Sequence, residues 1–395
     1  MSHSLIAKKL EQIAPFHVME VMKAADELAT QGQDIIHLSV GEPDFTAAPA
    51  VVTALQQALL QAGQGDATAL RYSNALGRAD LRRAIAQFYQ ARYQLAIAPE
   101  RIVVTAGASA ALLLVLNALL DPDDQVLMPD PCYPCNRHFV VAAGGKPQLV
   151  PCGPEQRYQL TAHDVAAHWQ ANTKGVLLAS PSNPTGTSIA PDELARMVEV
   201  VRSKGGFTIV DEIYGGLVYD HAPHTALHLG EDVIVVNSFS KYFNMTGWRL
   251  GWLVLPQALV PAVEKLAQNL FICPPAPAQA AALACFAPES LALFEERRQA
   301  FKERRDYLVP ALEALGLKIP VQPDGAFYVY ADCSALSSNS EQFVMDVLRA
   351  TGVCMVPGKD FGFAAPERYV RISFATALPR LQEAVGRLQK HLAMR

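Results

Sequence analysis

The sequence predicts an α/β protein with two unequal parts: a large domain on a mostly parallel, doubly wound sheet and a smaller α+β domain. Short β-branched strands alternate with amphipathic helices through the middle of the chain, and such alternation is typical of a parallel sheet covered on both faces. After about residue 287 a long charged helical stretch replaces this alternation. The 395 residues, of which 51% are apolar and 18% charged, are enough for roughly two or three buried cores.

The expected strands of the large domain are short apolar runs rich in Val, Ile and Leu. They cover residues 101–105, 125–129, 146–150, 175–179, 207–210 and 233–236. Helices with an apolar period of about 3.6 residues are expected around them, over residues 109–120, 133–143, 191–203 and 257–270.

The smaller part begins with a charged helix expected over residues 291–315. Strands near residues 325–330 and 369–373 follow, with helices over 340–351 and 378–391. The turn Gly41-Glu-Pro-Asp44 ends the N-terminal segment, which could join either part. We assign it to the small domain, so that residues 46–287 form the large domain and residues 1–45 with 288–395 form the small one.

Charge and hydropathy argue against several classes of partner. The formal net charge is −5 and no run of Lys or Arg occurs, so neither a nucleic acid nor a membrane surface is expected to bind. The N-terminal residues contain no apolar core long enough for a signal peptide, and the longest apolar runs, such as residues 106–120, are too short to span a bilayer. We expect a cytoplasmic protein.

The cysteines and histidines do not predict a metal site. Seven scattered cysteines, an odd number, do not suggest a disulfide framework. Cys132 and Cys135 form one C-x-x-C, but no second pair completes a tetrahedral zinc site. His221, His224 and His228 lie in a Pro-containing stretch without carboxylates, and we interpret them as loop residues.

The most informative segment reads Ser238-Phe-Ser-Lys-Tyr-Phe-Asn-Met-Thr-Gly-Trp-Arg-Leu-Gly251. Lys241 lies between the hydroxyls of Ser238 and Ser240, eight residues before Arg249. A lysine amine forms an imine with an aldehyde, while hydroxyls and a guanidinium bind a phosphate dianion. A surface lysine on a turn is the alternative, but apolar surroundings make a charged lysine costly to bury. The segment therefore predicts a site for an aldehyde cofactor that carries a phosphate.

Further candidates follow the expected strands, at the sheet edge where open α/β proteins bind ligands. Gly107, Ala108 and Ser109 begin a helix whose backbone N–H groups suit a phosphate, although many ordinary helix caps look similar. Tyr133 lies between prolines and could stack on a planar cofactor.

Four more polar side chains have a chemical reason to lie in the same site. Asn183 is in a Pro- and Gly-rich turn and could donate its amide hydrogen to a ring hydroxyl. Asp211 ends an apolar strand, shortly before Tyr214, and needs a cationic partner such as a protonated pyridine nitrogen. Arg371 lies inside an apolar strand, where a bidentate carboxylate is its natural partner.

Taken in order, these residues resemble the class I/II aminotransferases, pyridoxal-phosphate enzymes of fold type I, over nearly the whole chain. The lysine segment is the most specific part of the resemblance. The other matching segments are Gly41-Glu-Pro-Asp-Phe45, Tyr72 with Gly77-Arg-Ala-Asp-Leu-Arg82, Thr105-Ala-Gly-Ala-Ser109, Asp130-Pro-Cys-Tyr-Pro134, Asn183-Pro-Thr-Gly186, Asp211-Glu-Ile-Tyr214, Val356-Pro-Gly-Lys-Asp-Phe-Gly362 and Arg371.

The resemblance implies a role for each candidate. Lys241 would form the Schiff base with pyridoxal 5′-phosphate and later move the proton between Cα and the cofactor. Asp211 would pair with the pyridine nitrogen. Asn183 and Tyr214 would bind the ring oxygen, and Tyr133 would stack on the ring. The residues implied to hold the phosphate are Gly107, Ala108, Ser109, Ser238, Ser240 and Arg249.

The resemblance also implies a homodimer with shared active sites, because Tyr72 would reach the phosphate of the neighbouring subunit. Arg371 would bind the α-carboxylate of the amino acid, helped by Asn183 and the backbone at Gly41. The implied reaction is a ping-pong transfer of an amino group from an L-amino acid to a 2-oxo acid, with 2-oxoglutarate as the expected acceptor.

The amino donor stays open at this stage, and so do rival functions. Ser109 stands where aspartate-preferring relatives often carry Lys, and dicarboxylic, aromatic, alanine-type and diaminopimelate-type donors all remain. A C–S lyase or an eliminating lyase on the same fold would use the same Lys, Asp and Arg, although Thr246-Gly-Trp-Arg249 favours a transaminase. We expect no DNA-binding module of a regulator, and a nicotinamide dehydrogenase would need a glycine fingerprint that is missing.

Overall fold

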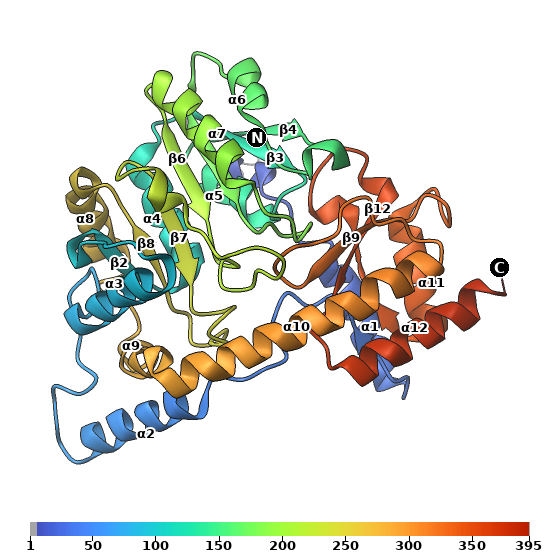
Figure 1. Cartoon of the computed structure of the whole chain (residues 1–395), viewed down its shortest axis with the longest axis horizontal. Helices are drawn as coiled ribbons and strands as arrows, with labels where there is room; N and C mark the ends of the chain where they lie inside the picture. The colour runs from blue at the N-terminus through green and yellow to red at the C-terminus, as the bar shows by residue number, and fades with distance from the viewer. Residues whose placement is uncertain (1–5, 395) are drawn as a thin grey trace.

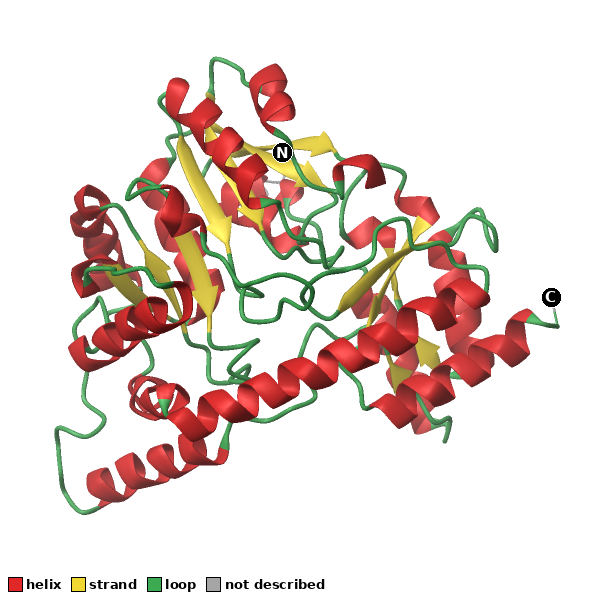
Figure 2. Cartoon of the chain, viewed as in Figure 1, coloured by secondary structure: helices red, strands yellow, loops and turns green. Residues whose placement is uncertain are grey.

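The computed structural model describes residues 6–394 and has a large sheet-based part and a smaller part at the C-terminal end of the chain (Figure 1). Residues 1–5 of the expected small domain, and residue 395, lie outside the described residues. The large part contains a mostly parallel sheet between helices (Figure 2). The prediction of an α/β fold is therefore confirmed.

The central sheet has seven strands in the order β2-β8-β7-β6-β5-β3-β4. Every neighbouring pair is parallel except the two pairs made by β8, which is antiparallel to both β2 and β7. The strands are β2 (Ile102–Thr105), β3 (Gln125–Asp130), β4 (Lys146–Pro151), β5 (Thr173–Ala179), β6 (Phe207–Asp211), β7 (Ile234–Ser238) and β8 (Gly251–Val254).

Both faces of this sheet are buried, because successive residues of a strand point to opposite sides. On β6, Val210 belongs to one apolar cluster with α7 (Pro191–Ser203), whereas its neighbour Ile209 belongs to a second cluster with α4 (Gly107–Leu119). The continuous apolar runs of the sequence therefore correspond to strands covered on two sides, as a doubly wound fold requires.

Four of the remaining helices of the large part lie around this sheet: α3 (Ala79–Tyr93), α5 (Pro134–Ala142), α6 (Ala162–His168) and α8 (Val260–Leu270). The other two, α2 (Pro49–Gly63) and α9 (Ala276–Ala282), pack against each other away from the sheet (Figure 1). Short 3₁₀ helices occur along the whole chain: η1 (Lys8–Gln12), η2 (Pro99–Arg101), η3 (Pro154–Gln156), η4 (Ala226–Leu229), η5 (Gln257–Leu259), η6 (Leu283–Phe286), η7 (Gly358–Asp360) and η8 (Pro366–Arg368).

The smaller part combines an antiparallel sheet with helices. Its strands β9 (Tyr328–Asp332), β11 (Val356–Pro357) and β12 (Tyr369–Ser373) have the order β11-β12-β9. The N-terminal segment joins this part, since β1 (Ile36–His37) pairs with β10 (Val353–Cys354). The domain boundaries 46–287 and 288–395 stay a prediction. The helices here are α1 (Val18–Thr30), α10 (Pro288–Ala314), α11 (Ser340–Thr351) and α12 (Leu378–Leu392).

Five strands differ from the expectation, and three of these, β1, β10 and β11, are only two residues long and were not predicted. The strand expected near residues 325–330 begins at Tyr328, because Gly325 and Ala326 donate their backbone N–H groups to Gly186 and Leu217 in the large part rather than to a neighbouring strand. The antiparallel strand β8 was not predicted, since its four residues Gly251–Val254 directly follow the lysine segment and carry no pattern of their own.

Helix α10 connects the two parts and runs along one side of the molecule from α9 to α12 (Figure 2).

No helix within residues 6–394 is long and apolar enough to cross a membrane.

Candidate active site

A pocket of about 600 Å³ opens where the large sheet meets the small part. The carboxyl ends of β5, β6 and β7 and the first turn of α4 supply one side of it, which is where parallel sheets bind ligands. Among the residues expected from the sequence, the following line this pocket: Gly41, Ala108, Ser109, Tyr133, Asn183, Asp211, Tyr214, Ser238, Ser240, Lys241, Arg249 and Arg371.

Two expected residues do not line the pocket. Gly107 lies just behind it, against the Arg249 guanidinium. Tyr72 is 76% exposed and lies outside the pocket of its own chain, as it would if it served a neighbouring subunit.

Lys241 presents a half-buried amine to the pocket. Its Nζ donates a hydrogen bond to the carbonyl oxygen of Gly41 (2.5 Å) and lies 5.7 Å from the ring centre of Tyr214. Burial lowers the pKa of this amine from its ordinary 10.5 to about 8, and the nearby Arg371 and Arg249 add to this, although Glu42 opposes it. The neutral, nucleophilic form of the amine is therefore accessible close to neutral pH.

The turn that carries Lys241 is held by backbone bonds and aromatic packing. Phe239 N–H donates to the Leu250 carbonyl, and Met245 N–H donates to the Phe239 carbonyl. The Phe239 ring packs against Trp252 of β8, with centroids 5.0 Å apart. Rigid packing of the neighbouring residues fixes the direction in which the lysine leaves the backbone.

Asp211 ends β6 as a buried carboxylate with 4% of its surface exposed. Among residues 6–394, only the Ile213 N–H donates to it, to one carboxylate oxygen at 3.0 Å. Burial raises its pKa from 3.8 to about 7, against the smaller opposing effects of that hydrogen bond and of Lys241. A buried carboxylate with so little compensation is suited to a cationic ligand group.

The first turn of α4 and Arg249 form an anion site at one end of the pocket. In the described part of the chain, the N-cap residue Ala106 of α4 makes no side-chain cap hydrogen bond, so the N–H groups of the first turn suit a ligand. A Cβ atom at Gly107, whose φ is +82°, would lie only 2.6 Å from Nη2 of Arg249, so glycine is needed for this close approach. Within residues 6–394 no carboxylate forms an ion pair with Arg249, which donates to the Thr246 carbonyl at 3.1 Å.

Ser238 and Ser240 lie beside this anion site. The Ser238 hydroxyl oxygen accepts the Ser240 N–H at 3.0 Å, which fixes the start of the turn after β7. Both side chains are buried and line the pocket.

Arg371 is a second buried cation, with 6% exposed. Its Nη1 donates to Oδ1 of Asn183 at 3.0 Å and its Nη2 donates to the Ser39 carbonyl at 2.6 Å. Its Nε has no hydrogen-bond partner among residues 6–394. The guanidinium lies 4.5 Å above the ring of Tyr328. A desolvated guanidinium bonded to neutral oxygens, with one donor unsatisfied, suits a carboxylate ligand.

Tyr328 is a site residue that the sequence analysis missed. It is fully buried, lines the pocket, and its Oη lies 2.9 Å from Oη of Tyr214. The sequence predicts a strand close to this residue, but nothing in the sequence relates that strand to Tyr214, which lies 114 residues earlier. Only the packing of β9 against the large part brings the two hydroxyls together.

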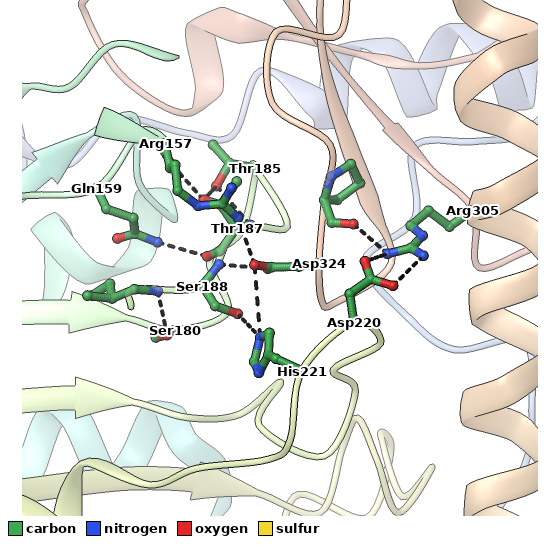
Figure 3. A network of polar contacts seen from close by, with 12 residues as sticks. Arg157, Gln159, Ser180, Thr185, Thr187, Ser188, Asp220, His221, Arg305 and Asp324 are labelled. Atoms are coloured by element: carbon green, nitrogen blue, oxygen red, sulfur yellow. Dashed lines mark hydrogen bonds and ion pairs between the residues drawn. The ribbon is translucent and has the colours of Figure 1, made fainter. Parts of the chain in front are cut away.

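A polar network holds the turn that carries Asn183 (Figure 3). The Asp324 carboxylate accepts the Ser188 N–H at 2.8 Å and an Arg157 N–H at 2.7 Å. The Asp324 N–H in turn donates to the Gly186 carbonyl at 3.0 Å. The turn is thus bonded to the loop that leads into β9 and Tyr328.

The same loop is bonded to the long helix α10 (Figure 3). Arg305 of α10 donates to the Pro323 carbonyl at 2.9 Å and forms an ion pair with Asp220. These bonds fix the position of the small part where it meets the pocket.

The cysteine pair and the histidines lie outside this chemistry. Cys132 is buried and Cys135 is half-buried, and both are free thiols whose pKa values are raised by burial. His221 and His224 lie in a loop, as expected, whereas His228 lies in η4 and its Nε2 is 3.0 Å from the Tyr93 carbonyl. No cluster of three or more potential metal ligands occurs in the part of the chain that the structure describes.

Comparison with known proteins identifies one protein family over nearly the whole chain. The model of the family "Aminotransferase class I and II" matches residues 33–388. A valine–pyruvate aminotransferase of Mycobacterium tuberculosis is 42% identical over 378 residues, which cover 95% of this chain and 96% of the relative. An aspartate aminotransferase of Thermotoga maritima is 32% identical and covers 99% of this chain and 100% of the relative.

Solved structures agree with this assignment. The crystal structure of an aminotransferase from Mycobacterium tuberculosis has a TM-score of 0.93 and 39% identity, covering 99% of this chain and 100% of that one. Aspartate aminotransferase from Thermus thermophilus with maleate has a TM-score of 0.90 and 32% identity, covering 98% and 99%. The pocket, the family model and these relatives lead to one conclusion: this chain belongs to the class I and II aminotransferases and is an aminotransferase.

Proposed function

We propose that this aminotransferase uses pyridoxal 5′-phosphate, bound in the pocket around Lys241. The residues fit such a group: an uncapped helix N-terminus with Arg249 suits the phosphate, and Asp211 suits a protonated pyridine nitrogen. When bound, this cofactor supplies an aldehyde that reacts with amines and a ring that accepts the electron pair of a broken Cα–H bond.

The chain's own residues bind the substrate, hold the cofactor and move a proton in this proposal. Arg371, with Asn183 and the backbone at Gly41, binds and orients the α-carboxylate of the amino acid. Lys241 holds the cofactor at rest and moves a proton to and from the substrate Cα as a general base. Asp211 keeps the ring nitrogen protonated. Tyr214 would hydrogen-bond the ring oxygen, and Tyr133 would hold the ring by stacking; both side chains line the pocket.

The observation that carries the proposal is the opposite pKa shift of two groups that line the same pocket. Burial lowers the pKa of the Lys241 amine to about 8 and raises that of the Asp211 carboxyl to about 7. Such paired shifts are typical of acid–base sites.

The decisive experiment is the absorbance spectrum of the purified protein with pyridoxal 5′-phosphate, followed by single amino acids. We expect a visible band that requires Lys241, and its loss with release of the matching 2-oxo acid when a donor is added. Lys241→Ala should bind phosphate ligands but show no such band. Release of ammonia or a thiol in place of amino transfer would overturn the proposal in favour of a lyase.

The acceptor has two candidates. The resemblance to the family favours 2-oxoglutarate, and this prediction remains to be tested. The relative at 42% identity is named for valine and pyruvate, which makes pyruvate the second candidate. Rates of the second half-reaction with each oxo acid, starting from the aminated enzyme, distinguish them.

We also propose a homodimer with shared sites, in a cytoplasmic location. The 76% exposure of Tyr72 outside its own pocket supports the shared site. Sedimentation should give twice the 42.8 kDa of one chain, and Tyr72→Phe should weaken cofactor binding although Tyr72 lies outside the pocket of its own chain. A monomer with full activity would contradict this.

A further inference from the structure

Tyr72 lies in the irregular segment of residues 64–78, which connects α2 to α3 (Figure 1). This connection consists of turns and irregular backbone, and the Tyr72 side chain at its surface is 76% exposed. A loop of this kind directs an exposed ring precisely only if other parts of the molecule fix its backbone. The contacts that fix this segment therefore decide where the Tyr72 hydroxyl lies.

One buried side chain, Gln279 of α9, binds the segment at two places. Gln279 is fully buried. Its Oε1 accepts the Arg78 N–H at 2.8 Å, and its Nε2 donates to the Ser73 hydroxyl oxygen at 3.0 Å. Nε2 also donates to the Pro274 carbonyl at 3.0 Å. The amide thus joins the residue next to Tyr72 to the end of the same segment and to the residues just before α9.

The chemistry of these partners fixes the orientation of the amide. The Arg78 N–H can only donate, so it faces the amide oxygen, and the Pro274 carbonyl can only accept, so it faces the amide nitrogen. The second amide hydrogen is then directed to the Ser73 hydroxyl oxygen, which itself donates to the Asn74 carbonyl at 3.1 Å. Since a buried polar group without a partner is costly, this arrangement is strongly preferred.

The same segment packs closely against β2 at Gly77, whose φ is +89°. A Cβ atom at this position would lie 2.5 Å from Cβ of Val104 and 3.1 Å from Oε1 of Gln279, so glycine is needed for the close approach. The Val104 N–H donates to the Leu76 carbonyl at 3.0 Å. The end of the segment is thus fixed to the large sheet, and the bond between Ser73 and Gln279 extends this attachment to within one residue of Tyr72.

Resting on the proposed function, in which Tyr72 binds the cofactor phosphate in the neighbouring subunit, we infer that Gln279 is a positioning residue that acts across the dimer. It holds the segment of residues 64–78 so that the Tyr72 hydroxyl reaches the phosphate dianion, whose hydrogen bonds depend strongly on geometry. Gln279 is not among the described residues that line the pocket of its own chain. It therefore serves the pocket of the other chain.

The first test is Gln279→Met, which keeps the length of the side chain and removes its three hydrogen bonds. We expect the dissociation constant of pyridoxal 5′-phosphate, measured from the Lys241-dependent absorbance band, to rise about tenfold. The matched control is Gln148→Met on β4, which alters a half-buried glutamine whose Nε2 donates to the His168 carbonyl at 2.9 Å. This control should leave the dissociation constant unchanged. An unchanged value in Gln279→Met would overturn the inference.

Mixed dimers show in which chain the effect appears. One chain carries Lys241→Ala, so that only the pocket of the other chain gives the absorbance band. With Gln279→Met placed in the Lys241→Ala chain, the reporting pocket receives Tyr72 from an altered segment, and its dissociation constant should rise about tenfold. With Gln279→Met placed in the chain that keeps Lys241, the value should stay within about twofold of a mixed dimer without it. The reverse pattern, or equal effects, would overturn the inference.

Tyr72→Phe in the same mixed dimers distinguishes this inference from the proposed function. If Tyr72→Phe weakens binding across the dimer and Gln279→Met does not, only the positioning role is refuted. If Tyr72→Phe has no effect across the dimer, the shared site itself is refuted. The double variant should bind the cofactor about as well as Tyr72→Phe alone, because positioning a missing hydroxyl has no effect. Additive losses would mean a general loss of structure and would refute the positioning role.

Ser73→Ala provides the same test with less disturbance of the core. It removes only the hydroxyl that accepts one amide hydrogen of Gln279, on a half-buried residue of the loop. We expect the dissociation constant of the cofactor to rise about threefold, again only in the pocket of the other chain. An unchanged value would overturn the inference, whether or not Gln279→Met folds.

Discussion

Asp211 allows a prediction about stability that does not depend on catalysis. In the folded protein without cofactor its pKa is raised from 3.8 to about 7 by burial. A carboxyl whose folded pKa is raised stabilises the fold when protonated, and this contribution is lost as the pH rises through the folded value. The full shift corresponds to about 4 kcal/mol. Asp211→Asn removes this pH-dependent penalty.

The measurable quantity is a difference between two pH values. Between about pH 5 and about pH 8, wild-type protein should lose roughly 3 kcal/mol of unfolding free energy relative to Asp211→Asn. Urea unfolding of the cofactor-free proteins at one fixed protein concentration measures it. The neighbouring Glu212, whose pKa burial raises to about 8, is present in both proteins. The Asp211 charge adds to the Glu212 shift, so Asp211→Asn also removes this smaller part, which has the same sign.

Asp34 provides a control with a pKa shift in the opposite direction. It is an exposed carboxylate whose pKa is lowered to about 2 by hydrogen bonds from Arg380 and Arg387. Its stabilising effect is lost only as the pH falls below its ordinary value, so Asp34→Asn should destabilise the protein equally at both pH values. Cofactor addition should stabilise wild type more than Asp211→Asn. The same unfolding difference between wild type and Asp211→Asn at about pH 5 and about pH 8 would refute the desolvation argument.

Three further predictions concern Lys241, Arg371 and Gly107. The rate of pyridoxal phosphate uptake should rise as the pH increases through about 8, because the pKa of the Lys241 amine is lowered to that value. A rise in this rate centred near pH 10.5, the ordinary pKa of a lysine, would mean that the amine is solvated. Arg371→Lys should raise KM for the amino acid about tenfold or more, since a lysine cannot bind a carboxylate in two places; an unchanged KM would mean that the carboxylate is bound elsewhere. Gly107→Ala should raise the dissociation constant of the cofactor about tenfold, because the new Cβ lies 2.6 Å from the Arg249 guanidinium. Gly144→Ala, with a φ of +90° and no heavy atom within 4 Å of the added Cβ, is the matched control and should bind the cofactor normally.

The sequence by itself determined the local chemistry and most of the elements. Helix α7 begins and ends where its apolar period predicts, over Pro191–Ser203. The order of strands and helices, the phosphate turn at Gly107, and Asp211 at the end of a strand also follow from residues that are neighbours in the chain. These features depend on periodicity, turn composition and the cost of burying a charge, all of which act over short distances in sequence.

The tertiary structure alone decided which distant residues share the pocket. The contacts of Tyr328 with Tyr214, of Arg371 with Asn183 and of Asp360 with the start of α1 join residues 114, 188 and 342 positions apart. The size of the pKa shifts of Lys241 and Asp211 depends on the same assembly, because desolvation is set by everything that packs around a group. No periodic pattern in the sequence predicts these contacts, because they form only when the small part and the N-terminal segment pack over the edge of the large sheet.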